Sequence, residues 1–219
     1  MIKFFLHAKH WHIFLLIFVI PMGLNFVMMF EMFSNITANL NFGEGNPPDP
    51  TIMFDHMKYL PLIILTTAIF QFGWQWSVGT SLHSKLPENT KMNIKVFKAF
   101  LIVPFIYTIV ISVGMGFLFK NMSELMQMGA QMDGQSPPDE LPKFLMFILI
   151  FILLHLFSMV CIFYNIYFIA RSLKSVEIQE TAKGDQYIGE FFLTWFLLIG
   201  IWFLQPRINT IFSETEIRE

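Results

Sequence analysis

The chain has 219 residues, of which 55% are hydrophobic and only 14% are charged, whereas about 25% of residues are charged in soluble domains. The formal net charge of −2 gives no support to a nucleic-acid partner, which would need a strongly basic surface. The single cysteine, Cys161, excludes an intrachain disulfide and a cysteine-based zinc or iron–sulfur site. The composition therefore indicates an integral membrane protein.

Four apolar runs are each long enough to cross a bilayer as a helix, because about 20 residues rising ~1.5 Å each span the ~30 Å hydrocarbon core. In chain order they are Trp11–Phe30, Tyr59–Leu82, Ala99–Phe119 and Phe144–Ala170. The polar stretches between them are too short to hold a soluble domain. The sequence predicts an all-α fold, a polytopic membrane helix bundle that forms a single domain over residues 1–219.

A fifth apolar segment, Ile188–Leu204, is shorter and reaches roughly 25 Å as a helix, which is marginal for a full crossing. It either spans the membrane or enters and returns. We favour the re-entrant form, with a turn near Leu198–Gly200 and a cytoplasmic tail. We expect Gln205-Pro206-Arg207 to end the segment abruptly, because proline interrupts a helix.

Basic residues are divided unequally between alternate loops. The loops 31–58 and 120–143 carry only Lys58, Lys120 and Lys143. The N-terminus and the other loops carry Lys3, Lys9, Lys85, Lys91, Lys95, Lys98, Arg171, Lys174 and Lys183. Because cytoplasmic loops are enriched in lysine and arginine, we expect a multi-pass protein of the cell inner membrane with a cytoplasmic N-terminus, the first helix being retained.

The two loops on the opposite side share a Gly-Pro-Pro-Asp pattern. It occurs as Gly45-Asn46-Pro47-Pro48-Asp49 and as Gly134-Gln135-Ser136-Pro137-Pro138-Asp139. A true repeat would make the protein two parallel helical hairpins related by an axis along the membrane normal. The alternative is coincidence, since proline-rich turns are common between helices.

Five polar side chains in the second and fourth runs form a candidate polar pocket: His155, Gln71, Gln75, Asn165 and Tyr164. Polar groups in a membrane need partners, so we expect these side chains to face the bundle interior. They either line a ligand pocket or hold the helices together by interhelical hydrogen bonds.

His155 is the titratable side chain that lies deepest in a long run, and an ionisable group at that depth is a functional hypothesis by default. The alternative is a neutral histidine that bonds to a neighbouring helix. The partners considered for that bond are Asn25, Thr66, Thr67, Gln71 and Ser112. No carboxylate at similar depth completes a proton relay.

Metal and catalytic sites receive little support. His7, His10 and His12 have a spacing that could suit a transition metal, and the methionines of 122–132 could bind Cu(I), but an interface anchor and an apolar helix face explain them as well. We expect no cofactor and no metal, and we identify no catalytic residue. The sequence therefore favours a protein that is not an enzyme.

Small residues and prolines predict how the helices pack. Ser112 and Gly116 are four residues apart and give the third run a small face for close helix approach. Pro21 and Pro104 should kink the first and third helices, because each removes a backbone N–H donor.

The C-terminal stretch 188–209, which contains Gly189-Glu190-Phe191-Phe192 and Gln205-Pro206-Arg207, resembles the end of small polytopic bacterial inner-membrane proteins of uncharacterised function. The start Lys9-His10-Trp11 is similar to theirs. Those proteins often have proline where this chain has Leu198. The resemblance implies a bacterial inner membrane and carries no active site across.

The leading hypothesis is an inner-membrane protein without enzymatic activity, acting as an accessory, scaffold or assembly subunit. Its partners would be the lipid bilayer and either further copies in a homo-oligomer or other membrane subunits. The alternative is a small transporter or ligand-binding membrane protein with a polar pocket between helices two and four.

Overall fold

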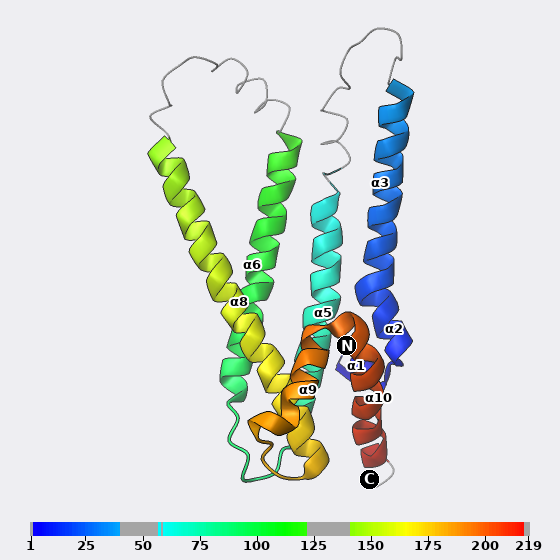
Figure 1. The fold of residues 1–219 in the computed structure, drawn as a ribbon, viewed down its shortest axis with the longest axis vertical. Helices are drawn as coiled ribbons and strands as arrows, with labels where there is room; N and C mark the ends of the chain where they lie inside the picture. Colours follow the sequence, from blue (N-terminus) through cyan, green and yellow to red (C-terminus); the bar gives the residue numbers. More distant parts are fainter. Residues whose placement is uncertain (1, 40–56, 58, 122–140, 217–219) are drawn as a thin grey trace.

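The computed structural model describes residues 2–39, 57, 59–121 and 141–216. These residues form helices and contain no strand, which confirms the all-α prediction. Long helices run up and down side by side, with both ends of the chain in the lower half of the view (Figure 1). Their bounds are His10–Phe14 (α2), Leu15–Val19 (the π-helix η1), Ile20–Asn39 (α3), Leu60–His83 (α5), Ile94–Lys120 (α6) and Leu141–Ile178 (α8).

Three stretches are long and apolar enough to cross a membrane, namely His10–Ala38, Ile94–Phe119 and Ile148–Ile178. The second predicted span corresponds to α5, which has 24 residues but carries Gln71 and Gln75 in its lower half. It packs between α6, α8 and α3. The structure therefore supports a membrane protein with three apolar crossings, and a crossing by α5 stays a prediction.

The two prolines have different local effects. Leu15–Val19 forms a π-helix directly before Pro21, where the missing N–H of proline leaves one carbonyl of the preceding turn without its donor. Pro104 lies inside α6, which continues to Lys120. The start of α6 is fixed by Asn93, whose side-chain oxygen accepts hydrogen bonds from the backbone N–H groups of Lys95 and Val96 at 3.0 and 3.2 Å.

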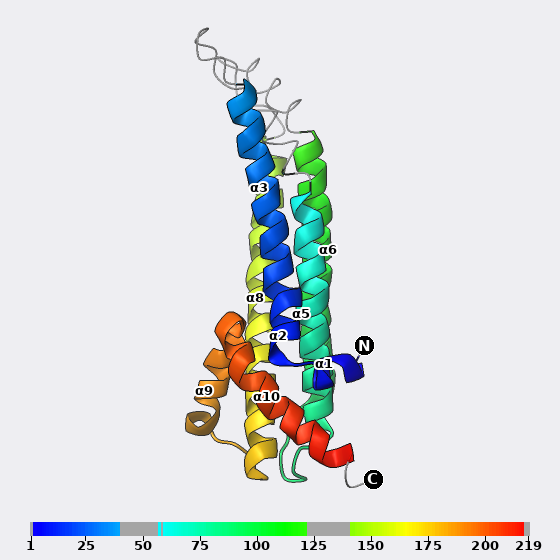
Figure 2. The ribbon, with the colours of Figure 1, turned by 90° about the vertical axis from the view of Figure 1, so that its right-hand side faces the viewer.

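The apolar core lies at the lower end of the bundle, where a short helix α1 (Ile2–His7) lies across the long helices (Figure 2). Its side chains come from α1, α2, η1, α5, α6, α8 and α10 (Leu197–Glu216). They are Phe5, Leu6, Ala8, Ile13, Ile17, Trp74, Val78, Leu82, Phe97, Leu101, Phe168, Ile169, Leu173, Val176, Leu197, Ile201, Leu204 and Ile208.

Glycine lies at two contacts between α5 and α6, of which the one at Gly79 is a close approach. The rings of Phe97 and Phe168 stack at 4.3 Å between centroids, and a Cβ added at Gly79 would overlap the Phe97 ring. At the other end of α5, a Cβ at Gly116 would lie 3.7 Å from Pro61. The predicted small face of α6 therefore packs against α5 at Gly116.

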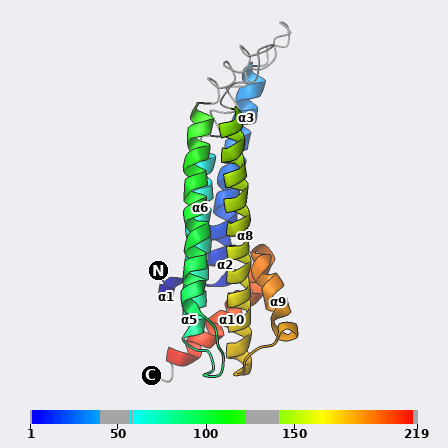
Figure 3. The same ribbon diagram turned by 90° about the vertical axis from the view of Figure 1, so that its left-hand side faces the viewer.

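The fifth apolar segment is a hairpin and not one straight helix. α9 covers Gly184–Trp195, Phe196 interrupts the helix with φ −89° and ψ 57°, and α10 follows. α9 rises beside α8 and α10 descends, so the C-terminus lies at the same end as the loop between α5 and α6 (Figures 1 and 3). The reversal comes two residues before the predicted turn near Leu198–Gly200.

The prediction that Gln205-Pro206-Arg207 ends the segment is wrong, because α10 continues through Pro206 to Glu216. The ring of Pro206 lies on the exposed side of the helix. Both neighbouring side chains are held by other helices, Gln205 by α1 and α5 and Arg207 by α8 and α9. These tertiary bonds compensate for the one backbone bond that proline removes.

The long helices alternate in direction, so the hairpins α3–α5 and α6–α8 point the same way (Figure 1). The Gly-Pro-Pro-Asp motifs that suggest a duplication lie outside the described residues, as does the methionine segment 122–132. The repeat therefore stays a prediction.

Replacing Gly200 by alanine should open the α9–α10 hairpin. A Cβ at Gly200 would overlap the backbone carbonyl of Leu193 in α9, whereas a Cβ at Gly189 meets nothing within 4 Å. We expect Gly200→Ala to lower the free energy of unfolding by about 1–3 kcal/mol and Gly189→Ala to be neutral or slightly stabilising. Thermal unfolding in detergent measures both, and equal losses for the two variants would contradict the close approach.

Candidate functional site

A buried amide joins three segments at the lower end of the bundle. Gln205 of α10 is fully buried. Trp74 of α5 donates its indole N–H to Gln205 Oε1 at 3.0 Å, and Gln205 Nε2 donates to the carbonyl oxygens of Phe5 and Ala8 at 2.8 and 3.1 Å. Nε2 also lies 2.8 Å from Asn209 Oδ1. We call this set of contacts the Gln205 junction.

The break between α1 and α2 explains why the junction is needed. Lys9 is extended, with φ −68° and ψ 152°, so carbonyls just before it receive no donor from a following helical turn. Gln205 supplies donors to the carbonyls of Phe5 in α1 and of Ala8 directly after α1, and Asn209 Nδ2 adds a bond to Ala8 O at 3.1 Å. The C-terminal helix thereby contributes to the backbone hydrogen bonding of the N-terminal segment.

A second set of contacts fixes the other side of α10. Arg207 donates through Nε to Glu177 Oε1 and through Nη2 to Glu190 Oε1, both at 2.6 Å, and Lys174 lies 3.7 Å from Glu190. Two cations thus balance two carboxylates contributed by α8 and α9. Hydrogen bonding to the Glu177 carboxylate is the main reason that the pKa of the Arg207 guanidinium lies above its ordinary value.

The predicted pocket residues Gln75 and Asn165 are both buried, and each has a side-chain oxygen that receives no hydrogen bond from the described part of the chain. Asn165 Nδ2 donates to the carbonyl of Phe100 in α6 at 2.9 Å, so its amide is oriented by that bond. Buried acceptors without donors are rare in folded proteins. These two oxygens are therefore the atoms of the predicted pocket that remain available to a bound donor.

Helix geometry places the two oxygens at a similar height. Gly79, Phe97 and Phe168 meet in one layer of the α5, α6 and α8 interface. Gln75 is four residues before Gly79 and Asn165 is three before Phe168, which is about one helical turn above that layer in both helices. The structure thus places these two predicted residues at a similar height on two helices that pack against each other.

The other three candidates lie elsewhere or have apolar surroundings. The ring of Tyr164 packs edge-on against Phe100, with centroids 5.1 Å apart. Gln71 lines a hollow of about 250 Å³ at the tip of the α9–α10 hairpin, together with Phe18 and residues 195–199. The candidate pocket is therefore divided, and Gln71 faces the hairpin.

His155 lies higher on α8 and is exposed at the side of the helix. Its Nδ1 is 3.0 Å from the hydroxyl of Tyr107 in α6. A bond to a neighbouring helix was one of the two predicted roles of His155. The partner was not among the five residues considered, because the rotation of α6 about its axis is not visible in the sequence.

The three N-terminal histidines have separate surroundings. The ring of His10 contacts Trp202 of α10, with centroids 4.6 Å apart, and His12 Nδ1 accepts a bond from the N–H of Lys9 at 3.2 Å. In the part of the chain that the structure describes, no group of three or more His, Cys, Asp or Glu residues could hold a metal ion.

Glu190 receives cations from α8 and α10, since both Lys174 and Arg207 contact its carboxylate. Arg171 instead donates to the Tyr167 hydroxyl and to the carbonyl of Ala182. The sequence does not indicate Arg207 as the main partner of Glu190, because Pro206 predicts a helix end just before it.

Replacing Gln205 by leucine should detach α1 from the bundle. The change leaves the Trp74 indole N–H and the Phe5 carbonyl buried without partners, at about 1–3 kcal/mol each. We expect a loss of roughly 2–6 kcal/mol in unfolding free energy and lower hydrogen-exchange protection of residues 2–8. Gln71→Leu is the control, since Gln71 is half-buried on α5; a similar loss there would contradict the role of the junction.

Comparison with protein-family models, with curated proteins and with solved structures finds no match for this chain. The resemblance of residues 188–209 to small bacterial inner-membrane proteins therefore stays a prediction.

Proposed function

We propose that the protein is a multi-pass protein of a bacterial inner membrane, with four crossings and a re-entrant C-terminal hairpin. The crossings are α2–α3, α5, α6 and α8. The N-terminus, the α5–α6 loop and the C-terminal tail lie in the cytoplasm, as the distribution of basic residues favours. The three apolar stretches support the membrane assignment, and the 24-residue length of α5 fits a crossing.

The surface and height of the hairpin support the re-entrant placement. Large apolar side chains are exposed around its tip: Phe192, Trp195, Phe196, Leu198, Ile199, Trp202 and Phe203. The tip lies beside Gln71 of α5. Gln71 comes twelve residues before His83, which places it ~18 Å above His83 along the helix. That height is about half of the ~30 Å hydrocarbon core, so the tip would rest in the apolar interior.

Within this membrane we propose a role without enzymatic activity, as an accessory, scaffold or assembly subunit. One observation carries the proposal: every residue from Ile148 to Phe157 in α8 is exposed. This length of α8 buries little of its surface against its own chain, apart from contacts with α6 such as the bond between His155 and Tyr107. Membrane helices associate through close packing, so this bare length of α8 is suited to helices of another copy or another subunit.

A groove beside α8 adds to this argument. It measures about 370 Å³ and is lined by Tyr107, Val110 and Gly114 of α6 and by Phe151 and Leu154 of α8. α6 and α8 diverge toward the upper end of the bundle on either side of it (Figure 1). A Cβ at Gly114 would meet nothing within 4 Å, and small residues allow a partner helix to approach closely.

A small transporter or ligand-binding protein is the second candidate. It is favoured by the two buried oxygens of Gln75 and Asn165 that lack donors, because a bound polar molecule could supply them. Since His155 bonds to Tyr107 and Gln71 faces the hairpin tip, such a site would be smaller than the pocket predicted from the sequence.

Thiol labelling of intact cells tests the placement of the chain. Ala38→Cys, Asn89→Cys and Ser213→Cys each introduce a thiol at an exposed position, in a background where the buried Cys161 is replaced by serine. We expect a membrane-impermeant reagent to label Ala38→Cys alone. Labelling of Asn89→Cys would reverse the orientation, and labelling of Ser213→Cys would mean that the hairpin segment crosses the membrane.

Purification in a mild detergent tests the scaffold role. We expect a particle larger than the 25.7 kDa monomer, either a homo-oligomer or a complex with another membrane subunit, as measured by light scattering. Leu149→Trp with Leu153→Trp places bulk on α8 at positions that are 57% and 58% exposed, and should disperse the particle without unfolding the chain.

The matched control is Met22→Trp with Phe26→Trp, which adds similar bulk to α3 at positions that are 74% and 71% exposed. The control particle should stay intact. A wild-type protein that is a clean monomer without any partner would overturn the scaffold proposal. Dispersal by the α3 pair alone would move the interface from α8 to α3.

A further inference from the structure

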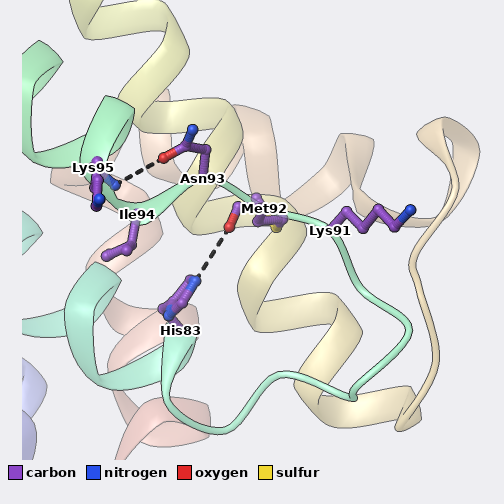
Figure 4. A pocket seen from close by; sticks show the side chains of 6 residues that line it. All are labelled: His83, Lys91, Met92, Asn93, Ile94 and Lys95. Atoms are coloured by element: carbon purple, nitrogen blue, oxygen red, sulfur yellow. Dashed lines mark hydrogen bonds between the residues drawn. The ribbon is translucent and has the colours of Figure 1, made fainter.

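A hollow of about 550 Å³ lies where α5 ends and α6 begins. It is lined by His83, Lys91, Met92, Asn93, Ile94 and Lys95. Lys91 and Lys95 lie on either side of it, with Met92 and Ile94 between them (Figure 4). The hollow thus combines two cationic side chains with the apolar side chains of Met92 and Ile94.

The wall of this hollow is held in place by bonds from several elements. His83 Nε2 donates to the carbonyl of Met92 at 3.2 Å, and the hydroxyl of Ser172 in α8 lies 3.5 Å from the Met92 sulfur. The hydroxyls of Thr90 and Thr181 are 2.8 Å apart. The loop before α6 is therefore fixed on two sides, and the hollow is a formed feature of the fold.

Its positive charge is not balanced within the described residues. Lys91 and Lys95 are exposed and form no ion pair there, although Glu88 belongs to the same loop. The first turn of α6 contains no acidic residue. Lysines at a helix N-terminus repel the partial positive charge of that end. An anion in the hollow would relieve this repulsion.

An apolar groove of about 250 Å³ continues along the same pair of helices. Trp76, Phe72 and Ile69 line it from α5, and Ile102 and Phe105 line it from α6. Spacings of three and four residues put these side chains on the faces that also carry His83 in α5 and Lys95 in α6. Lys98, whose ammonium group lies 5.4 Å from the centre of the Trp76 ring, joins the two regions.

We propose that the hollow and the groove together bind one anionic phospholipid of the cytoplasmic leaflet. Lys91 and Lys95 contact the phosphate of its headgroup, and an acyl chain lies in the groove along Trp76 and Phe105. Lys95 and Phe105 are ten residues apart in α6, or ~15 Å, which is the thickness of one leaflet's hydrocarbon layer. Charge at one end and an apolar path of matching length select an anionic amphiphile.

This lipid site goes beyond the scaffold role and requires only the membrane placement, which the labelling experiment tests separately. The test uses the full-length protein in nanodiscs of phosphatidylcholine, titrated with phosphatidylglycerol, with the midpoint of thermal unfolding as the readout. We expect phosphatidylglycerol to raise the midpoint of the wild type. Lys91→Gln with Lys95→Gln should weaken the apparent affinity by roughly fivefold for each lysine removed.

The matched control is Lys3→Gln with Lys183→Gln, which removes the same charge at two exposed positions outside the hollow. It should respond to phosphatidylglycerol like the wild type. An equal loss in both double variants would show general attraction to the membrane surface and overturn the site.

A third variant and a soluble anion separate lipid from free phosphate. Ile102 is 44% exposed, so Ile102→Trp should fold while filling the groove and should reduce the response to phosphatidylglycerol. Inorganic phosphate, added to nanodiscs of pure phosphatidylcholine, should leave the midpoint unchanged. Stabilisation by inorganic phosphate together with an unchanged Ile102→Trp variant would overturn the lipid assignment in favour of a soluble anion.

Discussion

The lower end of this molecule depends on one constraint, which is that buried backbone N–H and C=O groups need hydrogen-bond partners. The helix is interrupted at Lys9, in a region packed among apolar side chains. Such an interruption leaves backbone carbonyls that need donors. Gln205 and Asn209 provide those donors from α10. Because Gln205 also accepts the bond from Trp74, the position of α10 is determined by α1 and α5 together.

The spacing of two residues between Gln205 and Arg207 extends this constraint to the other helices. Two residues turn about 200° around a helix, so these side chains lie on opposite sides of α10. Gln205 forms hydrogen bonds with α1 and α5 on one side, and Arg207 pairs with carboxylates from α8 and α9 on the other. A single turn of α10 is thus bonded to four other helices, and the α9–α10 hairpin has a fixed place against the bundle.

The positions of the long helices follow from the apolar runs in the sequence. Contacts that depend on how each helix is rotated about its axis do not. The second run, Tyr59–Leu82, differs from α5 by one residue at each end. By contrast, α3 continues nine residues beyond the first run to Asn39, and α8 continues eight beyond the fourth run to Ile178, because a helix can extend into polar sequence. The contact between Tyr107 and His155 depends on how α6 and α8 face each other, which no spacing within one helix reveals. The helix end predicted at Pro206 is wrong because tertiary bonds to residues far along the chain compensate for the backbone hydrogen bond that proline removes.

Among the described residues, the polar contacts are concentrated at the end that we assign to the cytoplasm. The Gln205 junction, the Arg207 ion pairs and the lysines beside α6 all lie there, whereas the upper part of α8 presents apolar side chains on every side. A tightly bonded end keeps the helices in register, so the other end needs few contacts within the chain. The upper helix surfaces are therefore free to contact lipid or other membrane helices, which is what a scaffold subunit requires.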